Sequence, residues 1–251
     1  MKILIACEES QTVCNAFREL GYEAYSCDIE PCSGGHPEWH IQGNVLDIIG
    51  IGDKTILLQN GESIFIQNWD LMIAHPPCTY LTRAATRWLY PNHKLNKERY
   101  NKGLKAKEFF MKLLNADIPM IAIENPVPHK VFKMTKETQI IQPFYFGHKA
   151  QKTTLLWLKN LPKLTSTNTL FKHTPPEFMR DSKGIRHSKW FMDCGYDSKL
   201  KSKTFKGIAK AMAEQWNNPI IKQHQNNENG EANENKSSPL KTPEVTSFHS
   251  G

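Results

Sequence analysis

Two short segments combine residue types that could carry out covalent chemistry. Pro76-Pro77-Cys78 follows an apolar run at 71–74, and Glu124-Asn125-Pro126 follows another at 120–123. Proline fixes the backbone and offers no N–H donor, so the first segment predicts a rigid loop that holds the Cys78 thiol in place. A thiol is a nucleophile, and a carboxylate on a neighbouring strand can serve as acid, base or hydrogen-bond partner for a bound substrate. We therefore predict Cys78 and Glu124 as the catalytic pair.

The segments that position these residues alternate between strands and helices. Residues 3–6 form an apolar strand, and the following helix carries Val13, Phe17 and Leu20 on one face. A second strand at 23–27 completes a β-α-β unit, the usual opening of a doubly wound parallel sheet. Further strands are expected at 70–74, 120–123 and 154–158, and further helices at 97–115 and 208–216. This order predicts an α/β fold with a mainly parallel sheet.

Two segments depart from that alternation. Residues 55–59 and 63–67 flank Asn60-Gly61, which predicts an inserted β-hairpin. The last part of the chain is rich in Asn, Glu, Ser and Lys and has almost no large apolar residue, which predicts a disordered tail. We therefore expect one α/β domain at 1–217 and a tail at 218–251. In the helix at 97–115 the expected buried residues are Leu104, Phe109, Leu113 and Leu114.

Ligands of open α/β sheets bind beyond the carboxyl ends of the strands. Cys78 and Glu124 both belong to that edge. Several further polar residues follow other predicted strands and should converge there, namely Cys7, Glu8, Glu9, Ser10, Asp28, Glu30 and Asp47. One thiol and several carboxylates at one edge are typical of an enzyme site.

Taken in this order, the strand-end residues resemble the DNA cytosine-5 methyltransferases. Pro76-Pro77-Cys78 is similar to their Pro-Cys signature and Glu124-Asn125-Pro126 to their Glu-Asn-Val signature. Asp28 resembles their acidic group for the adenosine ribose, and the segment from Gly43 to Asp47 resembles their next cofactor segment. Phe146-Gly147 with Gln151, followed by the closing helix, extends the resemblance to about residue 216.

The resemblance implies a Rossmann-like methyltransferase fold and a reaction. Cys78 would add as a thiolate to C6 of cytosine, Glu124 would hydrogen-bond or protonate N3, and C5 would then accept a methyl group from S-adenosylmethionine. The substrate would be DNA, with the target base flipped out of the duplex. The implied cofactor-binding residues are Cys7, Glu8, Glu9, Ser10, Asp28, Asp47 and Pro76. The implied substrate-binding residues are Arg83, Arg87, Asn125, Gln151, Lys152 and Arg186.

The sequence departs from this family at several positions. The glycine-rich first loop is replaced by Cys7-Glu8-Glu9-Ser10, and glycine is what allows a backbone to approach a ligand closely. The arginine expected after Gln151 is replaced by Lys152, and Pro126 stands for valine. Only some fifty residues separate Thr154 from the closing helix, so a full target-recognition domain is not expected. A basic, aromatic-interleaved stretch at 180–190 could hold phosphates there.

Composition places the chain among proteins without a membrane-spanning helix. No apolar run reaches the roughly 20 residues that cross a bilayer, and the chain opens directly as a strand, so a cytoplasmic location in a bacterial or phage-infected cell is expected. The formal charge is +7, and the part before residue 222 carries 29 basic against 21 acidic residues. That balance suits a phosphate-rich partner. The six cysteines are expected to be reduced thiols.

Three other interpretations remain open from the sequence. The chain could modify a pyrimidine nucleotide or DNA with another one-carbon donor, or it could be a non-catalytic nucleic-acid-binding relative. A third is a zinc-stabilised module, because the spacing Cys-x4-Cys-x3-His-x3-His of Cys27, Cys32, His36 and His40 approaches that of zinc sites. We expect no metal, since Cys27 ends a strand and points to the core. His75 is expected to be an ordinary loop histidine.

Overall fold

The computed structural model describes residues 1–50, 52–168, 177–195 and 197–217. Residues 1–217 form one compact unit. The predicted disordered tail at 218–251 lies outside the described residues, so that expectation stays a prediction. All six cysteines fall within the described ranges and are free thiols, as expected from the sequence.

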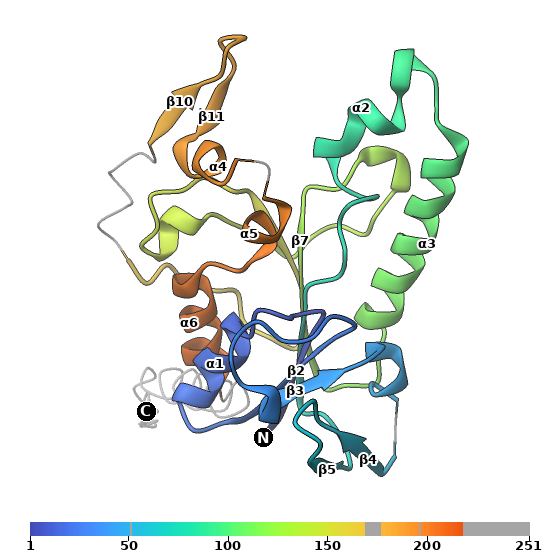
Figure 1. Cartoon of the computed structure of the whole chain (residues 1–251), viewed down its shortest axis with the longest axis vertical. Coiled ribbons are helices and arrows are strands. Elements are labelled where there is room, and N and C mark those ends of the chain that lie inside the picture. The colour runs from blue at the N-terminus through green and yellow to red at the C-terminus, as the bar shows by residue number, and fades with distance from the viewer. Residues whose placement is uncertain (51, 169–176, 196, 218–251) are drawn as a thin grey trace, which may run out of the picture. The chain divides into compact units, whose positions relative to one another are not determined.

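Within the described part of the chain, seven strands form one sheet in the order β3-β2-β1-β6-β7-β9-β8 (Figure 1). The first five are parallel, whereas β9 runs antiparallel to β7 and to β8. This confirms the predicted doubly wound, mainly parallel sheet. The strands are β1 Lys2–Ala6, β2 Glu23–Asp28, β3 His40–Gln42, β6 Leu71–Ala74, β7 Met120–Pro126, β8 Gln139–Ile141 and β9 Thr154–Lys159.

The central strands are apolar on both faces because helices cover both faces of the sheet. Every residue of β6, and β1 from Ile3 to Ala6, is fully buried. Alternate residues belong to two different core clusters: Leu4 and Met72 pack on one side, Ile3 and Leu71 on the other. The long apolar runs read from the sequence are therefore the middle layer of a three-layer molecule.

The helices divide between the two faces. The face of Leu4 is covered by α3 (Lys97–Leu114) and the face of Ile3 by α1 (Thr12–Glu19) and α6 (Lys206–Gln215), which pack against each other. Shorter helices complete the described set: α2 Thr86–Leu89, α4 Lys189–Asp193 and α5 Ser198–Ser202. No helix in the described ranges is long and apolar enough to cross a membrane.

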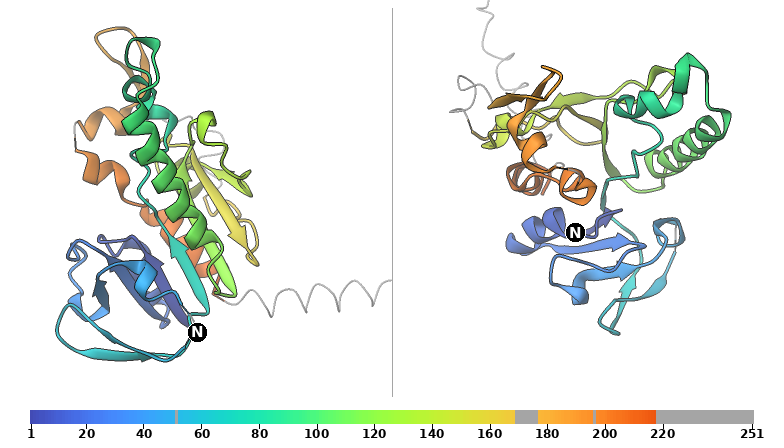
Figure 2. Two further views of the ribbon diagram at one scale, coloured as in Figure 1. Left: turned by 90° about the vertical axis from the view of Figure 1, so that its right-hand side faces the viewer. Right: turned by 45° about the horizontal axis from the view of Figure 1, so that its top comes forward.

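Two small hairpins lie outside the main sheet. The expected hairpin around Asn60-Gly61 is confirmed as β4 (Lys54–Leu57) and β5 (Ser63–Ile66), which pair antiparallel. The second is formed by β10 (Phe178–Arg180) and β11 (Arg186–Ser188) in the basic stretch. Figure 2 shows the two hairpins at opposite ends of the molecule.

The expected helix faces need two corrections. Leu20 and Leu104 are 46% and 42% exposed, so neither belongs to the core. In α3 the buried residues are Gly103, Phe110 and Leu113, and Phe109 and Leu114 are partly buried against the same core, so only Leu104 departs from the expected face. Glu124 and Asn125, expected just after a strand, are the last part of β7, which runs on to Pro126.

The order of the strands locates the ligand-binding edge. From β1 the chain moves outward through β2 to β3, and it then returns to the other side of β1 to form β6 and β7. The strand order reverses between β1 and β6, and such switch points open a crevice at the carboxyl ends of the strands. The loops after β1 and β6 carry Glu8, Glu9 and Cys78.

The start of α6 provides a test of this packing. A Cβ at Gly207 would overlap the carbonyl oxygen of Phe146. Alanine normally stabilises a helix by about 0.5–1 kcal/mol over glycine, but here we expect Gly207→Ala to lower the free energy of unfolding by about 1–3 kcal/mol through overpacking. Urea denaturation measures it, with Gly43→Ala, which has open space, as the control. Equal stability of G207A and wild type would contradict this packing.

Candidate active site

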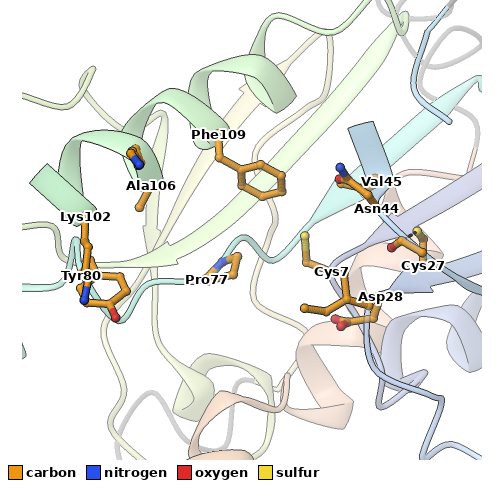
Figure 3. Close-up of a pocket in the computed structure, with 13 residues that line it drawn as sticks. Cys7, Cys27, Asp28, Asn44, Val45, Pro77, Tyr80, Lys102, Ala106 and Phe109 are labelled. Atoms are coloured by element: carbon orange, nitrogen blue, oxygen red, sulfur yellow. Dashed lines mark hydrogen bonds between the residues drawn. The ribbon is translucent and has the colours of Figure 1, made fainter. Parts of the chain in front are cut away.

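Three cavities lie at the carboxyl edge of the sheet. The thiol cavity, of about 360 Å³, is lined by the segment 75–79, by 124–126, by Lys152 and by part of α5. The apolar cavity, of about 550 Å³, lies between the ends of β1 and β2 and helix α3 (Figure 3). The first-loop cavity, of about 130 Å³, is lined by Cys7 to Ser10 together with Asp28, His75 and the residues from Ser202 to Thr204.

Hydrogen bonds on both sides fix the loop that carries Cys78. The backbone N–H of His75 donates to the carbonyl of Ala6 over 2.9 Å, which ties the loop to β1. The buried side chain of Asn125 donates to the carbonyl of Pro76, also over 2.9 Å, which ties it to β7. With Pro76 and Pro77 between these two anchors, the backbone before the thiol has little freedom. The expected rigid loop is therefore present, and Asn125 acts on it rather than pointing to solvent.

His75 and Glu124 form a buried ion pair. Nδ1 of His75 lies 3.0 Å from Oε2 of Glu124, and each side chain is only 11% exposed. Burial alone would lower the pKa of His75, but the hydrogen bond and charge of Glu124 leave it above its ordinary value. Burial would raise the pKa of Glu124, but the His75 hydrogen bond and the charge of Lys152 hold it below its ordinary value. Each group of the pair therefore favours the charged form of the other.

The Cys78 thiol is held in its protonated form. Burial raises its pKa, and the negative charge of Glu124 raises it further, whereas the ammonium group of Lys152 lowers it. Cys78 and Glu124, predicted to act together, line the same cavity and interact electrostatically. Lys152 stands where the resemblance leads one to expect an arginine, and it supplies the positive charge that favours the thiolate.

Helix α5 adds positive charge that was not anticipated. Lys199, Lys201 and Ser202 line the thiol cavity opposite the Cys78 loop. Together with Lys152, the two lysines give this cavity a positively charged wall around the single carboxylate of Glu124. Ammonium groups and hydroxyls in such a setting bind phosphate oxygens through charge-assisted hydrogen bonds. The cavity can therefore hold a substrate that carries a phosphate beside its reacting group.

The apolar cavity has the character of a nucleoside site. Its walls include Val45, Pro77 and the ring of Phe109, and Asp28 stands at its polar end. Figure 3 shows Cys7 and Asp28 at one end of the cavity and Phe109 above Pro77. Burial strongly raises the pKa of the Cys7 thiol, so Cys7 is a wall residue rather than a second nucleophile. Phe109, expected to be purely a core residue, is partly buried and lines this cavity.

In the first loop, Glu8 closes the start of helix α1. Its carboxylate accepts hydrogen bonds from the backbone N–H groups of Val13 and Cys14, at 2.8 and 3.2 Å. Glu8 is 5% exposed, and burial raises its pKa. A helix N-terminus is otherwise a binding site for a ligand's anionic group, so this chain has filled that position with its own carboxylate. Oε2 of Glu9 is buried and has no hydrogen-bond partner within the described ranges.

Several predicted site residues lie outside the three cavities. Asp47 follows β3, but its neighbours Asn44 and Val45 line the apolar cavity instead. Gln151 donates its backbone N–H to Ser188 Oγ, and the Arg186 guanidinium stacks 3.6 Å from the Phe178 ring centroid. By contrast, the structure brings Cys7, Glu8, Glu9, Ser10, Asp28, Pro76, Asn125 and Lys152 to the cavity walls.

Arg83 and Arg87 belong to an exposed basic wall, which we define as residues 79–107. It carries three arginines and five lysines against the single acidic residue Glu98. Trp88 is 57% exposed with the Arg87 guanidinium 4.9 Å from its ring centroid, and Tyr80 lies under Arg99 at 5.0 Å. Exposed aromatic rings among cations are the pattern of surfaces on which nucleobases stack. The wall begins beside the thiol, since Thr79 lines the thiol cavity.

The zinc alternative finds no support in the side-chain positions. Both ring nitrogens of His40 are engaged, Nδ1 with Ser26 Oγ at 2.8 Å and Nε2 with the Glu30 carbonyl at 3.0 Å. His36 pairs with Glu38 at 2.9 Å. Within the described ranges, no group of three or more histidine, cysteine, aspartate or glutamate side chains is placed to hold a metal ion.

Sequence reasoning missed His75, which it treated as an ordinary loop residue, and the α5 lysines. The signal for His75 was its position directly before the Pro-Pro turn, at the end of a fully buried strand. Since a strand-end side chain next to a catalytic loop has few ways to reach water, it needs a polar partner nearby. Lys199 and Lys201 gave no local signal, because they reach the site only through the path of the chain from β11 to α6.

Comparisons with known proteins add little to this geometry. No protein-family model matches the chain, and no curated protein matches it. One solved structure that resembles it is a prophage-encoded protein of E. coli, provisionally described as a DNA modification methyltransferase. The two share 10% identity with a TM-score of 0.33, over 63% of this chain and 46% of the other. The match thus spans less than half of that chain.

Lys152 provides a test of the thiol's environment. Its positive charge lowers the pKa of Cys78, so Lys152→Met should raise that pKa and reduce the thiolate fraction at any pH below it. Alkylation of Cys78 by iodoacetamide should slow by up to about tenfold per pKa unit, and its pH profile should move to higher pH. Mass spectrometry of the Cys78 peptide measures the rate. Lys149→Met is the matched control, because Lys149 pairs with Glu177 outside the cavity. Equal rates for both variants would contradict this role.

Proposed function

We propose that this protein transfers a methyl group from S-adenosylmethionine to C5 of cytosine in DNA, with Cys78 as the covalent nucleophile. The observation that carries the proposal is the shared cavity of Cys78 and Glu124, with the two strand ends tied together by the Asn125–Pro76 bond. A thiol and a carboxylate fixed on adjacent parallel strands are the groups needed to activate a pyrimidine ring from both sides.

The residues present suit two of the three parts of S-adenosylmethionine, namely its adenosine and its cationic groups, whereas its carboxylate needs another site. The apolar cavity, with Phe109 and the Asp28 carboxylate, suits an adenosine. Glu9 pairs through Oε1 with Lys199 at 4.0 Å, and its buried Oε2, which has no hydrogen-bond partner in the described ranges, suits an ammonium or sulfonium group. The amino acid carboxylate cannot lie on the start of α1, because Glu8 occupies those N–H groups. Lys203 and Thr204, on the far wall of the first-loop cavity, are the groups that would receive it. When bound, S-adenosylmethionine supplies an electrophilic methyl group.

The chain's own residues would prepare the base for that methyl group. Cytosine C5 is a poor nucleophile, so the Cys78 thiolate first adds to C6 and places an electron pair on the ring. Lys152 stabilises the thiolate before the attack. Glu124 stabilises the charge that spreads to N3, a role that needs a fixed and preorganised group. After C5 is alkylated, its proton passes to solvent water, the electron pair of that C–H bond re-forms the C5–C6 double bond, and Cys78 leaves C6 as the thiolate.

Two basic surfaces flank the Cys78 loop and support a nucleic acid as the substrate. The basic wall leads away from Cys78 on one side, and the segment of β10, β11, α4 and α5 lies on the other (Figure 1). Lys199 and Lys201 of α5 reach the thiol cavity itself. Because a duplex buries C6 within the base stack, the target cytosine must leave the stack to reach Cys78. The phosphates flanking such a base would meet cations on both sides.

Trapping on a fluorinated base tests the reaction directly. A fluorine at C5 cannot leave as a proton does, so the adduct between Cys78 and C6 persists after methyl transfer. Incubation with an oligonucleotide containing 5-fluorocytosine and S-adenosylmethionine should give a covalent complex, detected by mass spectrometry of the intact protein. Cys78→Ser should abolish it. Cys194→Ser, which removes another free, partly exposed thiol, should not. Stable DNA binding without any adduct would reject the proposed reaction.

Trp88 tests the basic wall as a DNA surface. If bases stack on its ring, Trp88→Ala should weaken binding of a single-stranded oligonucleotide by about 1–3 kcal/mol. Fluorescence anisotropy of a labelled oligonucleotide at fixed salt measures the affinity. Phe65→Ala is the matched control, since Phe65 is equally exposed, at 56%, but lies on the β4–β5 hairpin. The role of Trp88 would be refuted by W88A and F65A binding equally well.

The closed start of α1 favours a second candidate, in which the same thiol chemistry uses a different one-carbon donor. Glu8 fills the position that a glycine-rich loop would leave for a ligand's carboxylate. The trapping experiment separates the two: an adduct that forms with cytosine but does not depend on S-adenosylmethionine favours the other donor. A non-catalytic nucleic-acid-binding protein would instead show full DNA binding and unchanged biological effect with Cys78→Ser.

A further inference from the structure

His75 lies between two buried carboxylates and borders two cavities. Its Nδ1 lies 3.0 Å from Glu124 on the side of the thiol cavity. Its Nε2 is buried without a hydrogen-bond partner in the described part of the chain, and His75 also lines the first-loop cavity with Glu8 and Glu9. The charge of Glu8 acts on His75 directly. His75 is thus the side chain through which the two cavities are electrostatically connected.

The charged groups around His75 come from every element that packs against it. Glu124 of β7 forms the hydrogen bond, and Lys152, just before β9, opposes the imidazolium charge. The Cys78 thiol lies on the same loop as His75. The loops after β1 and β2 contribute Glu8, Glu9 and Asp28. Helix α5 contributes Lys199, whose Nζ lies 4.0 Å from Glu9 Oε1, and the segment after it contributes Lys203, which leaves three carboxylates against two ammonium groups. Net negative charge on the side of the first loop therefore favours a proton on His75.

We propose that His75 stores the proton that Glu124 gives to N3 of the base, and that His75 passes it to Glu124 when the first-loop cavity holds a positive charge. The proposal deepens the proposed function and rests on it. His75 is a positioning residue in this scheme, since it touches Glu124 and not the reacting atoms.

The transfer balances within the pair. The N–H bond at Nδ1 of the imidazolium breaks and an O–H bond forms on Glu124, so that a cation and an anion become two neutral groups. Neutral Glu124 is a hydrogen-bond donor, and it releases its proton to N3 as negative charge develops on the ring after thiolate addition. When the thiol leaves and the ring is restored, the proton returns to Glu124 and then to Nδ1. No external acid is consumed.

A positive group in the first-loop cavity favours this transfer for a simple reason. Like charges in a poorly hydrated site repel strongly, so a sulfonium or ammonium beside Glu8 and Glu9 disfavours the imidazolium form of His75. The closest acceptor for the released proton is Glu124, already hydrogen-bonded to Nδ1. Glu124 would therefore become an acid only when the donor is in place, which keeps the thiol cavity inactive without it.

Histidine NMR tests the proposal without measuring activity. The protein is labelled with 13C at histidine Cε1, and the His75 signal is assigned by its loss in His75→Asn. Its titration is recorded alone, with S-adenosylmethionine and with S-adenosylhomocysteine, which has nearly the same shape but an uncharged sulfur. We expect the His75 midpoint to lie at least about one pH unit lower with the sulfonium ligand than with the thioether.

His187 serves as the internal control. It forms a pair of the same length with Asp181, 3.0 Å, but lies on the β10–β11 hairpin and lines none of the three cavities. Its midpoint should not differ between the two ligands. Equal His75 midpoints with both ligands bound would overturn this inference and leave the proposed function standing. Absence of S-adenosylmethionine binding in the same titration would overturn both.

The pH dependence of adduct formation gives a second readout. Asparagine at 75 keeps a donor near Glu124 but cannot carry the proton. In wild type, pairing with Glu124 raises the pKa of His75, so the pair retains a proton to higher pH than an ordinary histidine does. The alkaline limb of the rate of adduct formation should therefore move to lower pH in H75N, which lacks that proton carrier. An unchanged limb would overturn the storage role, and a uniform loss at every pH would indicate a purely structural one.

Discussion

The buried pair between His75 and Glu124 is the interaction on which the rest of the site depends. It joins the ends of β6 and β7, 49 residues apart in sequence, and holds the Glu124 carboxylate beside the Cys78 loop. Its contribution to stability has a defined pH window. His75 has a raised pKa, so its contribution to stability is complete below pH 6.5 and is lost as the pH rises through its folded pKa. Glu124 has a lowered pKa, so its contribution is complete above pH 4.5 and is lost as the pH falls through its folded pKa. Both contributions are complete between these values.

Charge in the site is arranged so that the resting state is unreactive. Burial and Glu124 keep the Cys78 thiol protonated, while Lys152 opposes them. The α5 lysines extend the positive wall, so an incoming phosphate would be attracted to the cavity before the thiol ionises. The positive charge of this cavity thus comes from several lysines around one carboxylate and not from a single residue.

The first loop has a different local structure from a glycine-rich ligand-binding loop. In place of glycines it carries Glu8, whose carboxylate caps the α1 N–H groups. The cap satisfies the first N–H groups of the helix and at the same time removes an anion site. Since the charge of Glu8 also raises the pKa of His75, a residue with an ordinary capping role acts on the partner of Glu124.

The sequence by itself determined the parallel sheet, the hairpin and the residues at the strand ends, because apolar runs, turn residues and prolines act over a few neighbouring positions. It identified Cys78, Glu124, Asp28 and Lys152 at the ligand-binding edge for the same reason. Only the tertiary structure decided that His75 pairs with Glu124, that Lys199 and Lys201 face the thiol, and that Asp47, Gln151 and Arg186 lie away from the cavities. It also turned Leu104 outward and brought Phe109 to the apolar cavity. These outcomes depend on contacts between segments far apart in the chain, where the direction of a side chain is set by its packing partners and not by its neighbours in sequence.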